Sequence, residues 1–174
     1  MFKKLYPDMY VNSLKDIPLE KLKKMGKKSF ILDLDNTVTA WNSNEVDEEI
    51  YSWFVNIKKE GFKVCLLSNN VEERVLSVAN SLGIPYICRA GKPRRGSFYR
   101  ALSILESYPD ETVVVGDQIF TDILGGNRAG MFTILVVPIA RREFIGTKIA
   151  RSLEYLIVRR LKKYLGDNQE ITDI

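Results

Sequence analysis

Residues 29–37 of this chain read Ser-Phe-Ile-Leu-Asp-Leu-Asp-Asn-Thr, and this stretch decides the fold class. An apolar run at residues 30–32 leads directly into two carboxylates, Asp33 and Asp35, followed by the hydroxyl of Thr37. Such a run is typical of a strand that is buried on both faces of a parallel sheet. Open α/β sheets bind ligands at the carboxyl ends of their strands, so the carboxylates lie where a functional site is expected. An acidic turn after the strand is the alternative.

Further apolar runs alternate with helical patterns along the rest of the chain. Strands are expected at residues 29–34, 62–67, 85–90, 112–115 and 132–137. Helices are expected at residues 45–59, 71–82, 97–107 and 121–129, with a short one at 18–25. Either Asn69 or Asn70 is expected to cap the helix at 71–82, and Gly83 to end it. The alternation predicts a three-layer α/β fold with five parallel strands and right-handed crossovers.

The composition of the chain limits the number of domains, the location of the protein and the groups available for acid and base chemistry. A chain of 174 residues with 45% hydrophobic residues is expected to form one domain over residues 1–174. Cys65 and Cys88 lie in apolar runs, and we interpret both as buried small hydrophobic residues in a reducing compartment. No secretory signal or membrane-spanning run is apparent, which predicts a cytoplasmic location. The chain has no histidine, so carboxylates would carry acid and base chemistry.

The charge is polarised along the chain. Residues 1–28, a lead segment, carry eight Lys against three acids, and residues 141–165 carry eight Lys or Arg against two acids. The net charge of +4 therefore combines two basic ends with an acidic remainder. Basic ends indicate an anionic partner, either a membrane surface or nucleic acid. The lead segment, rich in apolar and aromatic residues, either packs on the body or faces a membrane.

Polar groups follow four of the predicted strands. They are Asp33 and Asp35 after the first strand, Ser68 after the second, Lys92 after the third, and Asp117 and Asp122 after the fourth. These ends share one edge of the sheet, where carboxylates suit a magnesium ion and an ammonium suits a phosphoryl group. Each residue alone has a simpler interpretation. Residues 68–70 could form a turn and a helix cap, Lys92 could be a solvated lysine, and Asp122 could be an acidic residue in the first turn of a helix. Arg94 and Arg95 are either solvated or bind a second anionic group.

Four motifs in this order resemble those of the haloacid dehalogenase-like (HAD) superfamily of phosphatases, subfamily IIIA. They are DLDNT, the serine of LLSNN, the lysine of GKP, and GDQIFTD. The resemblance implies the strand order 5-4-1-2-3, and it implies that Asp33 is a nucleophile that forms an aspartyl-phosphate. It also implies that Asp35 protonates the leaving oxygen and then activates water. The second aspartate favours a phosphatase over phosphotransfer or pump chemistry.

The same resemblance implies a Mg²⁺ cofactor and a phosphate-binding set. The metal ligands would be Asp33, the main-chain carbonyl of Asp35, and Asp117, supported by Asp122. The phosphate-binding residues would be Thr37, Ser68, Asn69 and Lys92, together with backbone amides.

The spacing between the motifs leaves no room for a cap domain. Residues 37–62 hold one loop and one helix, and residues 68–92 hold one helix and one strand. An uncapped site suits a large substrate such as a protein, a nucleic-acid end or a lipid head group. A basic amphipathic helix is expected at about 141–165, and such a helix either lies on anionic lipid or packs on the sheet.

The lead segment, DLDNTVTAW and GDQIFTDILGGNR also resemble the bacterial YqeG-type branch, which is related to the phosphatidylglycerophosphate phosphatases. This implies removal of the terminal phosphate of phosphatidylglycerophosphate, an anionic phospholipid, by a protein that is peripherally associated with the membrane. Two alternatives stay open. One is a phosphatase for a nucleic-acid end or a phosphoprotein, and the other is a non-catalytic module that binds RNA or the ribosome.

Overall fold

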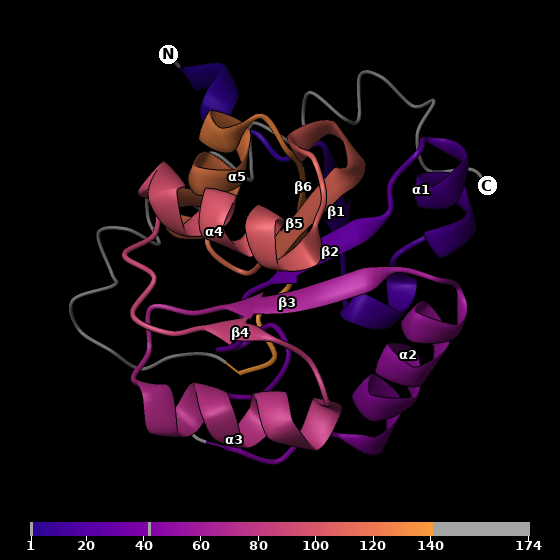
Figure 1. Ribbon diagram of the computed structural model, residues 1–174, viewed down its shortest axis with the longest axis vertical. Coiled ribbons are helices and arrows are strands. Elements are labelled where there is room, and N and C mark those ends of the chain that lie inside the picture. Colours follow the sequence, from indigo (N-terminus) through magenta and orange to yellow (C-terminus); the bar gives the residue numbers. More distant parts are fainter. Residues whose placement is uncertain (1, 42, 141–174) are drawn as a thin grey trace.

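The computed structural model describes residues 2–41 and 43–140, and these residues form the α/β architecture that the sequence predicts (Figure 1). The predicted basic helix at about 141–165 lies outside the described residues. The single domain over residues 1–174 stays a prediction. Among the helices that are described, none combines the length and the apolar character needed to cross a membrane.

A parallel sheet of six strands forms the centre of the molecule. The strands are β1 (Met9–Val11), β2 (Ser29–Leu32), β3 (Lys63–Leu67), β4 (Tyr86–Ile87), β5 (Thr112–Gly116) and β6 (Phe132–Val136). Their spatial order is β1-β6-β5-β2-β3-β4, so the five strands that were predicted keep the order 5-4-1-2-3. The segments that follow the neighbouring strands β2 and β5 therefore meet at one edge.

The prediction of five strands is wrong because it omits β1. Met9 pairs with Ile134 and Val11 with Val136, at the edge of the sheet beside β6. This edge strand has only three residues, and its central residue, Tyr10, is 39% exposed, so its apolar run is too short to identify a strand from the sequence.

The lead segment packs on the body of the protein, which decides between the two alternatives. The Asp8 carboxylate accepts a hydrogen bond of 2.7 Å from the backbone N–H of Thr133. The Asn127 amide donates to the backbone carbonyls of Lys4 and Tyr6, at 3.0 and 2.8 Å. These contacts join residues more than 100 positions apart, so no local pattern could predict them.

Helices cover both faces of the sheet (Figure 1). They are α1 (Leu19–Lys24), α2 (Glu48–Lys59), α3 (Glu72–Leu82), α4 (Arg95–Leu105) and α5 (Leu124–Ala129). Successive side chains of a strand point to opposite faces, so Phe30 and Leu32 pack in the core with α2 and α3, whereas Ile31 packs in the core with α4.

Several local predictions need correction. The strand expected at residues 85–90 is limited to the two residues of β4, because Arg89 turns the chain with a φ of 45°. No asparagine caps α3: Val71 is its N-cap residue and makes no side-chain cap bond. Cys65 is buried as predicted, and burial raises the pKa of its thiol to about 12. Cys88 is partly exposed, contrary to the prediction.

Candidate active site

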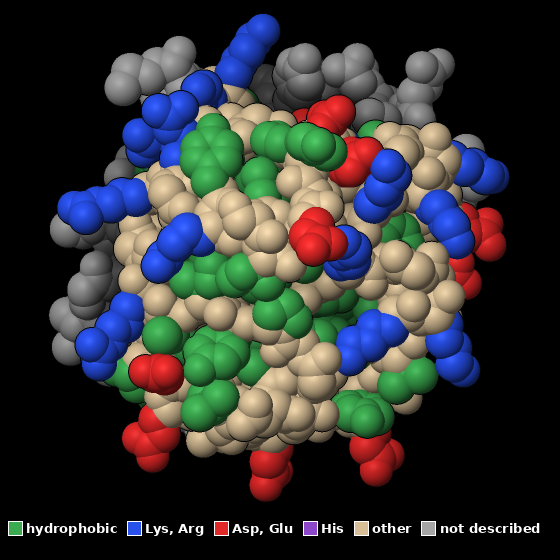
Figure 2. Space-filling view, viewed as in Figure 1, with side chains coloured by type: hydrophobic (Ala, Val, Ile, Leu, Met, Phe, Trp, Pro, Cys, Tyr) green, Lys and Arg blue, Asp and Glu red, His purple; other side chains and the backbone are tan. Residues whose placement is uncertain are grey.

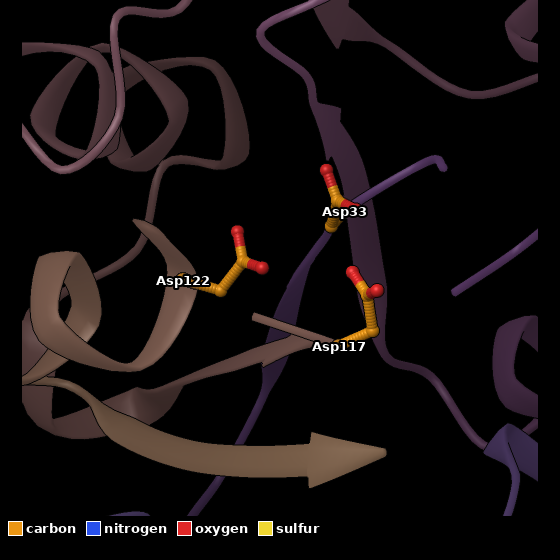
Figure 3. Close-up of side chains that lie close together, drawn as sticks. All are labelled: Asp33, Asp117 and Asp122. Atoms are coloured by element: carbon orange, nitrogen blue, oxygen red, sulfur yellow. The ribbon is translucent and has the colours of Figure 1, made fainter. Parts of the chain in front are cut away.

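Three carboxylates converge where β2 and β5 end. Asp33 follows β2, Asp117 follows β5, and Asp122 lies in a π-helical turn, Ile119–Ile123, just before α5. One carboxylate oxygen from each lies within 4.8 Å of the others, and the three side chains point toward one another (Figure 3). The pairing of β2 with β5 brings the residues that follow these strands together. Leu32 pairs with Val115, and the Asp33 N–H donates to the Val115 carbonyl at 2.9 Å.

Lys92 inserts its ammonium group between two of these carboxylates. Its Nζ lies 2.6 Å from Oδ1 of Asp33 and 2.6 Å from Oδ1 of Asp122, and its side chain is 3% exposed. Asn69 holds the backbone at this point, since its Oδ1 accepts from the Lys92 N–H at 2.8 Å. An ammonium has three N–H groups, so one stays available for a phosphoryl oxygen.

The charge of this cluster suits a divalent cation. Burial, together with the charges of Asp122 and Asp35, raises the pKa of Asp33 to about 7, against the opposing effect of Lys92. Burial would lower the pKa of Lys92, but Asp122 and Asp33 hold it above its ordinary value. Three carboxylates against one ammonium leave an excess of negative charge among hard oxygen ligands, which is the environment that Mg²⁺ prefers. Asp33, Asp117 and Asp122 fit as its ligands. The contribution of the Asp35 carbonyl stays a prediction.

Asp35 is held from both sides. Arg74 in the first turn of α3 donates from Nε to its Oδ1 at 2.9 Å, and Asn70 donates to its Oδ2 at 3.1 Å. Arg74 is absent from the site predicted from the sequence, because a single arginine in a polar first helical turn is usually solvated. Only the packing of α3 beside the segment after β2 brings the two side chains together.

A cavity of about 320 Å³ opens at this edge of the sheet. Asp33, Asp35, Asn69, Asn70, Lys92, Gln118 and Thr121 line it. Gln118 and Thr121, which the site predicted from the sequence did not include, lie in the GDQIFT stretch, where their place between Asp117 and Asp122 could have suggested them.

Two of the predicted phosphate-binding residues are not on the cavity wall. Ser68 is 1% exposed, and its hydroxyl accepts a hydrogen bond of 3.1 Å from the N–H of Asn70. Thr37 is 2% exposed, and its hydroxyl has no hydrogen-bond partner among the described residues. Their predicted roles in phosphate binding stay predictions.

Arg94 and Arg95 lie between Lys92 and the body of α4, at the same edge of the sheet. Both are exposed, and within the described part of the chain their guanidinium groups make no ion pair or hydrogen bond.

Two family models match successive parts of the chain. A family model described as mitochondrial PGP phosphatase matches residues 2–88, which include Asp33, Asp35 and Ser68. A second model, described as HAD-hydrolase-like, matches residues 89–138, which include Lys92 and the remaining acids.

Individual relatives agree with these models. The chain is 42% identical to a probable phosphatase, YqeG, of Bacillus subtilis over 94% of this chain and 95% of that protein. It is 29% identical to a chloroplastic and mitochondrial phosphatidylglycerophosphate phosphatase of Arabidopsis thaliana, over 97% of this chain and 52% of that protein. Its fold is similar to the cobalt-bound form of the deoxy-D-mannose-octulosonate 8-phosphate phosphatase of Haemophilus influenzae. That likeness has a TM-score of 0.56 at 16% identity and covers 70% of this chain and 73% of the other.

Proposed function

Because the chain belongs to the HAD-like phosphatases, in the family of YqeG and the PGP phosphatases, we propose that it removes the terminal phosphate of phosphatidylglycerophosphate in a Mg²⁺-dependent reaction. The observation that carries the chemistry is the cluster of Asp33, Asp117 and Asp122, with the ammonium of Lys92 between Asp33 and Asp122. The lipid substrate is supported by the family model over residues 2–88 and by the name of the plant relative.

In the proposed reaction Asp33 is the nucleophile. One of its carboxylate oxygens forms a bond to phosphorus while the bond from phosphorus to the alcohol oxygen breaks, and Asp35 gives its proton to that oxygen. Water then attacks the phosphorus of the aspartyl-phosphate and loses a proton to Asp35, while the bond from phosphorus to the Asp33 oxygen breaks. This step releases inorganic phosphate and restores both aspartates. Lys92 orients the Asp33 carboxylate and donates to a phosphoryl oxygen. Bound Mg²⁺ would neutralise charge on the phosphoryl oxygens.

The open site supports a substrate that is too large to be enclosed. Residues 33–47 connect β2 to α2 and residues 68–71 connect β3 to α3, and in the described residues neither connection contains a domain over the cavity. On the face seen in Figure 2, acidic side chains line the lower margin over α3, and the rest of the face carries many basic side chains together with acidic ones at its centre, near its top and at its right edge. A lipid head group at a membrane surface would reach the cavity without a cap that has to open.

The test is hydrolysis by the purified full-length chain of phosphatidylglycerophosphate in vesicles, beside a panel of soluble esters. The panel contains aryl phosphates, a nucleoside monophosphate, a nucleic acid with a 3′-phosphate and a phosphopeptide. We expect phosphate release from the lipid to exceed that from every soluble ester, to stop with EDTA and to return with Mg²⁺. The Asp33→Asn variant should lose activity by roughly a thousandfold or more, and the exposed Asp110→Asn should retain it.

Each contrary result has a distinct meaning. Preference for the nucleic acid or the phosphopeptide would replace the lipid as substrate while keeping the chemistry. Retained activity in Asp33→Asn would refute the nucleophile. Inactivity on all esters, together with salt-sensitive RNA binding, would favour the non-catalytic alternative.

A further inference from the structure

Arg74 connects the candidate acid of the reaction to the loop that follows it. Its Nε donates to Oδ1 of Asp35 at 2.9 Å, and one of its terminal nitrogens lies 2.8 Å from the same oxygen. The side chains of Arg74 and Asp35 are only 13% and 9% exposed. A charge-assisted pair that is this little exposed is more strongly oriented than a surface ion pair.

The same guanidinium group also binds the loop that follows Asp35. One terminal nitrogen donates to the Ser43 carbonyl at 2.7 Å and to the Asn44 side chain at 2.6 Å. The other donates to the Ala40 carbonyl at 2.9 Å and to the Thr39 hydroxyl at 3.3 Å. This Arg74-bound loop, residues 39, 40, 43 and 44, is the chain segment next to Asp35, and in the described part of the chain no cap domain covers it.

The number of hydrogen bonds decides between two roles for Arg74. An arginine in a phosphatase cavity could bind a substrate oxygen directly. A guanidinium group has five N–H donors, and here all of them have acceptors on Asp35 and the Arg74-bound loop. Arg74 is also not among the residues that line the cavity. No donor is left for a substrate, so the contacts favour an internal role.

We propose that Arg74 is a positioning residue that fixes the Asp35 carboxyl toward the leaving oxygen and fixes the Arg74-bound loop as the wall on the leaving-group side. This inference rests on the proposed function of Asp35. Asn70 holds the other oxygen of Asp35 at 3.1 Å, so the carboxyl has a partner on each side. Without Arg74, the Asp35 side chain can move among its staggered rotamers, and misplacement by about 1 Å can cost roughly a hundredfold in rate.

A double-mutant cycle with Asp35 tests the role. Rates are measured as kcat/KM on aryl phosphates whose leaving phenols have graded acidity, since acidic phenols depart without a proton and allow Asp35→Ala to be measured. We expect Arg74→Ala to lower kcat/KM roughly 10- to 100-fold for weakly acidic phenols and less for acidic ones. In the Asp35→Ala background the same substitution should cost less than about threefold, because the residue through which Arg74 acts is gone.

A second measurement does not depend on activity. The N–H groups of Thr39 and Ser43 donate to the carbonyls of Leu34 and Ala40, and we expect Arg74→Ala to speed their hydrogen exchange about tenfold or more. Arg74→Lys keeps the charge without the fork, so it should restore only part of the rate and of the protection. Arg100→Ala, in an exposed arginine of α4, is the matched control and should change neither.

Several outcomes would overturn the inference. A rise in KM at constant kcat would show that Arg74 binds substrate, and an equal loss for all phenols in both backgrounds would show a merely structural role. Full activity of Arg74→Ala would refute the inference alone, whereas inactivity of the wild-type chain on every ester would refute it together with the proposed function.

Discussion

Lys92 determines the balance of charge at the bottom of the cavity. Its ammonium is the counter-charge for Asp33 and Asp122, at 2.6 Å from each, and all three side chains are almost fully buried. Loss of one member of such a group leaves uncompensated charge in a medium that solvates it poorly. We therefore expect the lysine to contribute to folding as well as to the proposed phosphate binding.

We predict that Lys92→Ala destabilises the metal-free protein by about 3 kcal/mol and lowers phosphatase activity by at least about a hundredfold. Since Mg²⁺ can replace the missing positive charge, it should raise the melting temperature of the variant more than that of the wild type. Urea denaturation and thermal melting with and without Mg²⁺ measure these effects. The control is Lys63→Ala, which removes an exposed ion pair with Glu106 and should cost less than about 1 kcal/mol. Equal effects of both variants would contradict the prediction.

At the scale of elements, the junction of β5 with the π-helical turn places Asp122. The turn brings this carboxylate against the backbone of Gly116, the last residue of β5, where a Cβ atom would lie 2.3 Å from the Asp122 carboxyl carbon. Gly125 and Gly126 serve close packing, because Cβ atoms there would lie 2.4 Å from Phe98 and 2.7 Å from Thr133. A π-helical turn at a functional site is a common way to aim a side chain.

We predict that Gly116→Ala displaces Asp122 and thereby weakens Mg²⁺ binding by roughly tenfold or more, with an overpacking cost of about 1–3 kcal/mol. Isothermal titration with Mg²⁺ and urea denaturation measure the two effects. Gly96→Ala is the matched control, because nothing lies within 4 Å of a Cβ at that position of α4. It should leave metal binding unchanged and not lower stability. Unchanged Mg²⁺ affinity in Gly116→Ala would refute the placement of Asp122 beside the metal.

For the whole molecule, an uncapped cavity and exposed cations lie on the same side. Every strand of the sheet runs in one direction, so the cavity and the loop before α4 share the carboxyl edge. Arg94 and Arg95 are exposed in that loop and at the start of α4. This arrangement would present the cavity to an anionic surface.

We predict that Arg94→Ala combined with Arg95→Ala weakens binding to anionic vesicles roughly tenfold or more, at about 1 kcal/mol for each basic residue near the membrane. Hydrolysis of the vesicle-bound lipid should fall with it, while hydrolysis of a soluble aryl phosphate should stay within about twofold. Vesicle co-sedimentation at low and high salt measures the binding, and Arg100→Ala is the control. Equal binding by the double variant and the wild type would show that these arginines do not meet the membrane.

The class of fold and the set of candidate site residues follow from local patterns in the sequence. Apolar runs that end in Asp33, Asp117 and Lys92 are local patterns, and parallel strands bring their carboxyl ends to one edge whatever the details of packing. The order of the five predicted strands followed from the family resemblance. The short edge strand β1 was not predicted, since its pairing depends on contacts of Asp8 and Asn127 with distant residues.

The contacts that hold the site together depend on packing between distant parts of the chain. The hydrogen bond from Arg74 to Asp35 joins residues that are 39 positions apart, and the local sequence around neither residue predicts it. The same packing removes the hydroxyls of Thr37 and Ser68 from the cavity wall and places Gln118 and Thr121 on it. The physical reason is that a strand pattern fixes where a residue leaves the sheet, whereas the direction of its side chain depends on neighbours from other parts of the chain.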